Sequence, residues 1–242
     1  MIELKNFSKE YDSFKAVSNL SYTFEKGTIT GILGPNGAGK TTILKALTGR
    51  HFASEGKVIF SETIDAAQAP EKIRNLTGFV EETASLPGEY TVKEYITFVA
   101  ELHGCNQAAV ENVIKKCSLE EYKNKKINSL SKGYKERVNF AQALVYNPEI
   151  LILDEPASGL DPQQIVNMRA LVKDLSKDHT IILSTHLMQE VEALCEKVLI
   201  INHGKLLAQG TKDEIVKNTV TKNLEEAFFK LTSSSGKEEE EK

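Results

Sequence analysis

The chain contains the segment Gly34-Pro35-Asn36-Gly37-Ala38-Gly39-Lys40-Thr41, followed by Thr42. The order of its glycines, lysine and threonine matches the pattern of a phosphate-binding loop. Glycines allow successive backbone N–H groups to converge on phosphate oxygens, and the N-terminus of a following helix adds a partial positive charge. The pattern predicts that Lys40 reaches the terminal phosphates of a nucleotide and that Thr41 offers its hydroxyl to Mg²⁺. The alternative is a glycine-rich turn that begins a helix and binds no ligand.

A second motif lies far downstream of the loop. The apolar run Ile-Leu-Ile-Leu, within a strand predicted at 149–154, leads into Asp154 and Glu155. Asp154 is placed to hold Mg²⁺, directly or through water. Glu155 can polarise an attacking water as a general base. A strand that meets a solvated loop would show the same residues, but a phosphate loop upstream needs the second half of a metal site, and this favours the functional interpretation.

The two motifs lie in a regular alternation of strands and helices. We expect strands at 2–7, 17–24, 28–33, 149–154 and 180–184, and helices at 40–47, 162–176 and 187–196. This order predicts an α/β fold whose parallel sheet is covered on both faces. The P-loop core would carry an antiparallel β lobe near the N-terminus and a helical lobe inserted at about 83–145. Residues 1–232 would form a single domain, and the acidic end at 233–242 would be disordered.

Composition excludes several classes of protein. The 242 residues are 40% hydrophobic and 26% charged, which is typical of a globular domain. The net charge is −4, so there is no basic excess of the kind that broad nucleic-acid binding uses. No window is apolar enough for a membrane helix, and the first residues form no signal core. Cys105, Cys117 and Cys195 lack metal-ligand spacing, so we expect free thiols and a cytosolic location.

Other candidate residues are weaker when each is taken alone. Ser131 and Gly133 flank the predicted start of a helix and offer a hydroxyl and backbone N–H groups to an anion. An N-cap serine and a loop glycine explain the same residues. His186 follows a buried strand, where a histidine is usually structural or solvated, and a lone Tyr11 is more often a packing residue than a base-stacking one.

Taken together, these residues resemble the nucleotide-binding subunit of an ABC transporter. The resemblance covers residues 2–231, with every motif in order. Segment 34–42 resembles the Walker A motif, and segment 150–155 resembles Walker B with Glu155 as its catalytic glutamate. The resemblance implies the ABC ATPase fold and an ATPase that uses ATP with Mg²⁺.

The ABC signature separates this family from other P-loop ATPases. Segment 130–134 resembles it, with Lys132 and Tyr134 in place of the usual glycine and glutamine. His186 resembles the switch histidine that would hold the γ-phosphate, and Tyr11 resembles the aromatic that stacks on adenine. The residues that resemble the D-loop are Ser158, Gly159, Leu160 and Asp161.

One position departs from the pattern of the family. The segment Gly78-Phe-Val-Glu81-Glu82 resembles the Q-loop, but Glu82 stands where a glutamine is usual. A carboxylate at this position could still be a ligand of Mg²⁺, and it would bring a negative charge. The alternative is a hydrated loop charge that takes no part in metal binding.

The resemblance also implies partners. Two copies, or this chain and a related ATPase subunit, would form a head-to-tail dimer with ATP between Walker A of one subunit and residues 131–133 of the other. Hydrolysis would drive a separate polytopic permease from the cytoplasmic face of the membrane. The signature and the ending at 223–232 resemble the subgroup paired with ABC-2-type exporters. The alternative is a soluble ABC-type ATPase that acts on nucleic acid or the ribosome, but a single cassette without a coiled-coil insertion favours transport.

Overall fold

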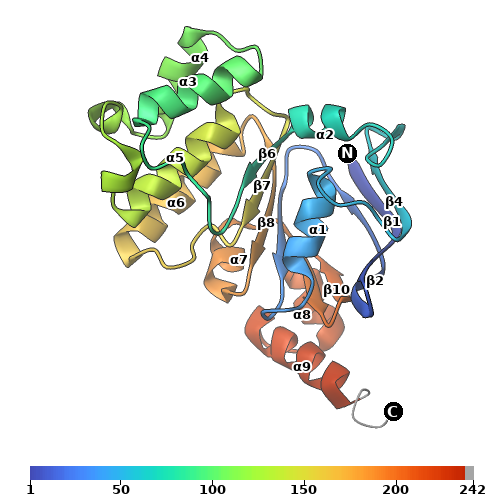
Figure 1. Cartoon of the computed structure of the whole chain (residues 1–242). Helices are drawn as coiled ribbons and strands as arrows, with labels where there is room; N and C mark the ends of the chain where they lie inside the picture. The colour runs from blue at the N-terminus through green and yellow to red at the C-terminus, as the bar shows by residue number, and fades with distance from the viewer. Residues whose placement is uncertain (238–242) are drawn as a thin grey trace.

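The larger of two β-sheets holds the predicted phosphate loop. The computed structural model describes residues 1–237, and within them this sheet has six strands in the order β10-β9-β3-β8-β7-β6 (Figure 1). The strands are β3 (Ile29–Leu33), β6 (Thr77–Val80), β7 (Ile150–Asp154), β8 (Thr180–Thr185), β9 (Lys197–Asn202) and β10 (Lys205–Gly210). β10 is antiparallel to β9, and the other neighbours are parallel. The predicted α/β fold with a parallel sheet is confirmed.

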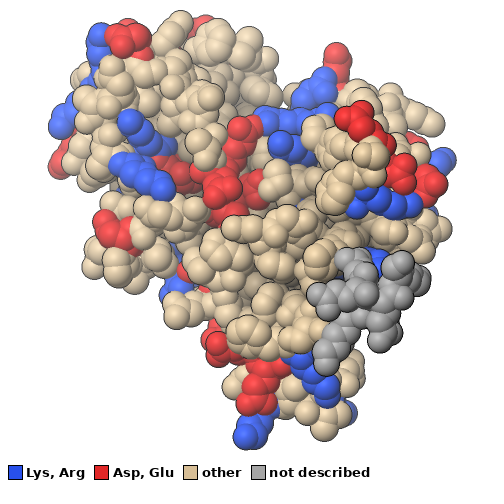
Figure 2. All heavy atoms as spheres, turned by 60° about the horizontal axis from the view of Figure 1, so that its bottom comes forward, with Lys and Arg blue, Asp and Glu red and all other residues tan. Residues whose placement is uncertain are grey.

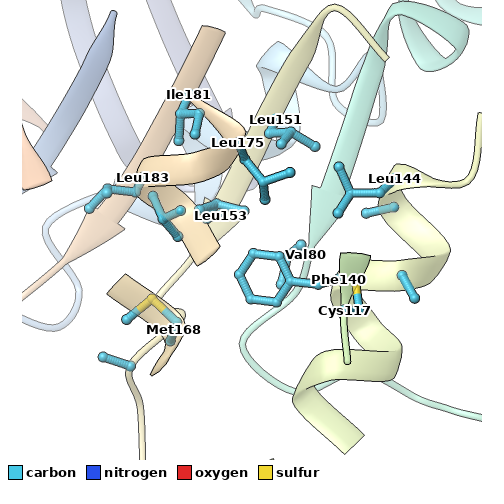
Figure 3. Packing of buried hydrophobic residues seen from close by; sticks show 14 of the residues in the cluster. Val80, Cys117, Phe140, Leu144, Leu151, Leu153, Met168, Leu175, Ile181 and Leu183 are labelled. Atoms are coloured by element: carbon cyan, nitrogen blue, oxygen red, sulfur yellow. The ribbon is translucent and has the colours of Figure 1, made fainter. Parts of the chain in front are cut away.

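Neighbouring residues of the central strands face opposite sides of this sheet, and both sides are buried. Leu151 and Leu153 belong to the core cluster that includes residues of the helical segments α5 (Lys132–Leu144) and α6 (Pro162–Leu175). Figure 3 shows these leucines among Phe140, Leu144, Met168 and Leu175. Ile150 and Ile152 belong to a second cluster with α1 (Lys40–Leu47) and the smaller sheet. Burial on both faces explains why the strands are unbroken apolar runs rather than alternating ones.

The smaller sheet is the antiparallel lobe near the N-terminus. Its strands are β1 (Ile2–Tyr11), β2 (Phe14–Phe24), β4 (Glu55–Phe60) and β5 (Ile64–Asp65), in the order β2-β1-β4-β5. Phe7, Phe24 and Phe60 are fully buried in the same cluster as the apolar residues of α1. The lobe therefore packs on the face of the main sheet that carries α1, as Figure 1 shows.

A helical segment lies between β6 and β7 in the chain. It contains α3 (Val92–Leu102), α4 (Gln107–Lys116) and α5, and Figure 1 shows it on the opposite side of the main sheet from the antiparallel strands. Thr91 caps α3: its hydroxyl accepts a hydrogen bond from the Glu94 N–H, while the Glu94 carboxylate accepts one from the Thr91 N–H. These reciprocal bonds satisfy two helix-end donors and fix where the helix begins.

Several helices were not predicted or have different bounds. Helices α2 (Pro70–Leu76), α8 (Lys212–Thr219) and α9 (Leu224–Lys237) were not predicted, and α7 (Met188–Leu194) is shorter than expected. The prediction of disorder from 233 was wrong for 233–237, which continue α9, while 238–242 lie outside the described residues. Extending a helix that is already nucleated costs much less than starting one, so α9 runs past the apolar residues that anchor it.

The described surface carries charges of both signs. Lysines and arginines are mixed with acidic residues on the face drawn in Figure 2, and a group of acidic side chains lies near its middle. This face therefore offers no broad basic area for a nucleic-acid backbone. No helix within residues 1–237 combines the length and the apolar character that crossing a membrane requires.

Candidate nucleotide-binding site

The candidate residues gather where the central parallel strands end. Leu33 of β3 pairs with Thr185 of β8, and Asp154 of β7 pairs with Ser184 of β8, so the loops after these strands begin side by side. They border a cavity of about 540 Å³, which we call the nucleotide cavity. Its lining residues are Tyr11, Phe14, Ala16, Asn36, Gly37, Ala38, Gly39, Lys40, Thr41, Thr42, Glu82, Glu155, Ser158 and His186. The carboxyl edge of such a sheet is where ligands usually bind in α/β folds.

The phosphate loop needs glycine at two of its positions. Gly37 and Gly39 have φ angles of 80° and 101°, which are in the left-handed region. A Cβ on Gly39 would also lie 2.6 Å from the Ala16 carbonyl oxygen of the antiparallel lobe. The Gly204 N–H donates to the Ala38 carbonyl at 3.0 Å, so the β9–β10 turn braces the loop from outside. Because Gly39 caps α1 without a side chain, the first N–H groups of this helix remain open to an anion.

Lys40 is the buried cation of the site. Its Nζ donates to the carbonyl oxygens of Gly34 at 2.8 Å and Pro35 at 3.2 Å, so these two loop residues hold the lysine rather than line the cavity. The same Nζ lies 3.0 Å from Glu155 Oε1, and the two side chains are only 6% and 8% exposed. An ion pair so far from solvent is weakly screened, so its charges act strongly on anything that enters the cavity.

Glu155 lies between Lys40 and His186. Its Oε2 is 2.9 Å from His186 Nδ1 and accepts a hydrogen bond from the His186 N–H at 3.3 Å. Within the described part of the chain, Glu155 Oε1 is a buried side-chain oxygen that accepts no hydrogen bond, although the Lys40 ammonium is close. Glu155 also has a φ of 47°, a costly conformation that aims its side chain into the site. The structure thus brings together the three residues expected to be catalytic.

Asp154 forms a hydroxyl-lined carboxylate site beside them. It is 4% exposed, and its Oδ1 accepts hydrogen bonds from Ser184 Oγ at 2.6 Å and Thr41 Oγ1 at 3.3 Å. Burial raises the pKa of Asp154, and the nearby Glu155 and Glu82 carboxylates raise it further, while the two hydroxyl donors lower it. A divalent cation would relieve this crowding of negative charge, and the oxygen donors of Thr41 and Asp154 fit Mg²⁺.

A metal at this place would depend on its substrate for further ligands. Within residues 1–237, no three His, Cys, Asp or Glu side chains gather closely enough to form a metal site by themselves. Mg²⁺ commonly takes one or two protein ligands and completes its shell with phosphate oxygens and water. Ser184 was not predicted, because a serine inside a buried strand gives no signal until the strand register places it against Asp154.

Aromatic residues border the other end of the nucleotide cavity. Tyr11 is 38% exposed, and its hydroxyl is 2.6 Å from His51 Nδ1. Phe14, which sequence reasoning missed, pairs with Tyr11 across the β1–β2 turn and is 63% exposed. An exposed phenylalanine beside a phosphate cavity provides a second flat surface on which a base can stack.

Glu82 and Ser158 close one side of the cavity. The Ser158 hydroxyl donates to Glu82 Oε1 at 3.2 Å, which joins the segment after β6 to the segment after β7. Among the other residues that resemble the D-loop, Asp161 is the N-cap of α6 and accepts from the Gln164 N–H at 2.9 Å, and Leu160 packs against the core. These two therefore have structural roles within their own chain.

The remaining candidates, Ser131, Lys132 and Gly133, lie outside the nucleotide cavity, and we call them the signature segment. Ser131 has the backbone conformation of an N-cap for α5, but its side chain makes no capping hydrogen bond within the described structure. Ser131 and Lys132 are exposed, and Lys132 lies over Gly159. The structure therefore leaves the signature segment away from the phosphate loop of its own chain.

Comparison with known proteins agrees with this arrangement. The chain matches the ABC transporter family over residues 17–158. It is 33% identical over 240 residues to the ABC transporter ATP-binding protein NatA of Bacillus subtilis (strain 168), covering 95% of this chain and 97% of that protein. A solved structure of an ATP-binding subunit of an ABC transporter has a TM-score of 0.87 at 27% identity and covers 96% and 99% of the two chains.

A third comparison concerns a cassette after hydrolysis. The dimeric structure of the ATP-binding cassette MJ0796 with ADP and Pi has a TM-score of 0.78 at 26% identity, over 87% of this chain and 98% of that one. The family match and the extent of the NatA match show that this chain belongs to the ABC transporter family. It is an ATP-binding subunit of an ABC transporter and an ATPase.

Proposed function

We propose that the chain hydrolyses ATP as a head-to-tail dimer, with each ATP between the nucleotide cavity of one copy and the signature segment of the other. The observation that carries this proposal is the position of the signature segment, which lies outside the nucleotide cavity of its own chain with Ser131 and Lys132 exposed. An anion bound at the phosphate loop of one copy would find the missing N–H and hydroxyl donors on a second copy.

The contacts within the cavity suggest how the chain's own residues act. Lys40 would turn from Glu155 toward the terminal phosphates and neutralise developing charge. Glu155 would then lose its neighbouring cation, and its Oε1 would accept the proton of the attacking water. His186 holds Glu155 Oε2 in place and would donate toward the γ-phosphate. Mg²⁺, held by Thr41 and Asp154, would supply charge neutralisation at the phosphates.

Two finer roles belong to the same proposal. Tyr11 and Phe14 would stack on the adenine at the aromatic end of the cavity. Glu82 would approach the metal when nucleotide is bound, leaving its hydrogen bond with Ser158. The remaining loop residues from Asn36 to Thr42 would surround the phosphates through their backbone N–H groups.

The transport partner would be a separate membrane protein. Members of this family act in transport, and no helix in residues 1–237 of this chain could span a membrane. We therefore propose that the chain binds a polytopic permease of the ABC-2 type at the cytoplasmic face of the membrane. The residues Lys132 and Tyr134 in the signature support assignment to the subgroup that pairs with ABC-2-type permeases.

Isolation of the complex tests this function. Tagged Glu155→Gln chain is purified from detergent-solubilised membranes with Mg²⁺–ATP, and the associated proteins and nucleic acids are identified. We expect two copies of the ATPase and a polytopic membrane protein, and we expect the Ser131→Arg control in the same background to lose the second ATPase contact. Recovery of ribosomal particles or nucleic acid without a membrane protein would instead support the soluble alternative.

A further inference from the structure

Helix α5 and the turn that follows it carry a row of polar side chains that bind the outer edge of strand β6. The Tyr146 hydroxyl donates to the Thr77 carbonyl at 2.9 Å, and Gln142 Nε2 donates to the Phe79 carbonyl at 3.2 Å. Asn139 Nδ2 donates to the Glu81 carbonyl, just past the end of β6, at 2.9 Å. We call Asn139, Gln142 and Tyr146 the polar ladder.

The geometry of the two elements explains this row. β6 is an edge strand of the main sheet, so every second carbonyl along it has no strand partner and needs another donor. The acceptors 77, 79 and 81 are spaced by two. The donors 139 and 142 are three apart, which places them on one side of α5, and Tyr146 lies in the turn just past the end of that helix. The ladder therefore closes the sheet edge with side chains of the helix that begins at the signature segment and of the turn that ends it.

Further contacts support the ladder at both ends. Gln142 Nε2 also donates to Asn139 Oδ1 at 3.3 Å, and Asn139 Nδ2 also contacts Glu136 Oε1 at 3.4 Å. At the other end, the Tyr146 ring stacks on His103 with a centroid distance of 3.8 Å. Because Asn139 is 1% exposed, water cannot easily replace its bond to Glu81.

The segment that the ladder holds is also held from the nucleotide side. Arg50, just past the end of α1, forms an ion pair with Glu81 and lies 4.8 Å from the ring centroid of Phe79. Helix α1 begins at the phosphate loop, and Glu82 next to this ion pair lines the nucleotide cavity. A displacement of α1 or Glu82 on nucleotide binding would thus move the carbonyls to which the ladder is bonded.

We propose that the polar ladder couples the nucleotide cavity of one chain to the position of that chain's signature segment. Asn139, Gln142 and Tyr146 are then positioning residues: they do not line the nucleotide cavity, and they act through β6 and α5. The inference rests on the proposed function, because the signature segment serves the ATP of a second copy. ATP binding in the cavity of one copy would then favour the position of its signature segment that completes the ATP site of the other copy.

A pair of substitutions at Gln142 separates the effect of losing its hydrogen bond to Phe79 from the effect of changing the size of the side chain. Gln142→Glu keeps the shape but replaces the donor with an acceptor facing the Phe79 carbonyl, whereas Gln142→Arg keeps a donor of similar reach. Gln107→Glu is the matched control, because Gln107 lies on α4 and its side chain bonds to Glu111 on the same helix, away from β6. All three are made in the Glu155→Gln background.

Two measurements are made with Mg²⁺–ATP. The first compares two quantities: the ATP concentration at which dimerisation is half-maximal, and the Kd of the dilute monomer for ATP. We expect Gln142→Glu to raise the former about tenfold and to leave the latter within about twofold, with Gln142→Arg and Gln107→Glu close to the parent. Equal losses in both quantities, or no loss in dimerisation, would overturn the coupling and leave a sheet-edge contact only.

The second measurement does not need a dimer. Amide hydrogen exchange at the start of α5 is followed in dilute monomer with and without Mg²⁺–ATP. We expect ATP to change protection there in the parent and in Gln107→Glu, but not in Gln142→Glu or in Tyr146→Phe, which loses only the bond to Thr77. If the parent fails to dimerise but shows this pattern, the head-to-tail function is wrong and the ladder stands. If the variants respond as the parent does, the ladder is wrong.

Discussion

The nucleotide cavity and the signature segment, although both resemble parts of one ATP site, are built in opposite ways. The cavity holds its charges in mutual contact, with Lys40, Glu155 and His186 linked by short distances and the first two almost fully buried. The signature segment is an exposed helix start whose serine makes no capping bond in the described structure. A buried charge needs a partner within the protein before any ligand binds, whereas water can satisfy the polar groups of an exposed segment until a ligand binds. In the proposed head-to-tail dimer, the signature segment is where the second copy would complete the ATP site.

The largest effect on this contrast is expected when the cation of the nucleotide cavity is removed. Lys40→Ala leaves the Glu155 carboxylate buried without its partner, which typically costs about 3–5 kcal/mol. We expect ATP binding to be lost and the melting temperature to fall. Calorimetric titration with Mg²⁺–ATP and thermal unfolding measure both effects. Lys45→Ala on the same helix is the control, and retained ATP binding in Lys40→Ala would contradict the role of Lys40.

Neutralising the base is expected to separate binding from turnover. Glu155→Gln keeps the size of the side chain but removes the proton acceptor at Oε1, so ATPase activity should fall by about 10²–10⁴-fold. ATP affinity should be retained, since fewer negative charges face the phosphates. Steady-state ATPase assays are compared with Glu149→Gln, which changes an exposed carboxylate immediately before β7. Near-normal turnover in Glu155→Gln would show that another group takes the proton.

The opposite half of the comparison is tested at the signature segment. Ser131→Arg adds a bulky cation at the exposed start of α5, outside the nucleotide cavity of its own chain. In the Glu155→Gln background we expect ATP-driven dimerisation to be lost while the Kd of the monomer for ATP stays within about twofold. Light scattering and titration measure the two quantities. Ser129→Arg, at an exposed neighbouring position, is the control, and a normal dimer in Ser131→Arg would place the interface elsewhere.

The sequence was sufficient to predict the residues of this contrast, but not their contacts. The phosphate loop, the strand before Asp154 and the helix start after Ser131 all follow from local patterns of glycine, apolar and capping residues. The bond from Ser184 to Asp154 and the pairing of Lys40 with Glu155 depend on which strands become neighbours. Phe14 and the polar ladder were missed for the same reason: their meaning depends on a turn geometry and on a sheet edge that no local pattern shows.

A smaller effect sharpens the comparison on the signature side. Glu136, on α5 behind the signature segment, is held largely out of water, and burial raises its pKa from 4.5 to about 7. The folded chain therefore binds a proton that the unfolded chain has released, and the free energy of unfolding falls as pH rises from about 4.5 to about 7. Glu136→Gln should abolish this slope and stabilise the protein by on the order of 1–2 kcal/mol above that window.

Denaturant unfolding across this pH range measures the effect. The control is Glu120→Gln, which changes an exposed carboxylate in the same helical segment. An unchanged pH slope in Glu136→Gln would mean that the carboxylate is solvated in the folded state. The signature side would then carry no buried charge of its own, and the contrast with the cavity would be complete.

The smallest expected effect concerns whether the exposure of the signature segment extends into the helices beneath it. Cys117 follows α4, and its carbonyl accepts a hydrogen bond from the Arg137 guanidinium of α5 at 3.1 Å. Burial raises the pKa of the Cys117 thiol to about 12. Burial raises the pKa of Cys195, which packs on Gly31 of β3, to about 12 as well. Since the thiolate is the reactive form, both should resist alkylation at about pH 8, while the half-buried Cys105 reacts. Mass spectrometry after a short labelling, with denatured protein as the control, should find one modified thiol in the native chain. Rapid labelling of Cys117 would mean that the segment is exposed because its helical support is loose, rather than because a firm surface is presented to a second copy.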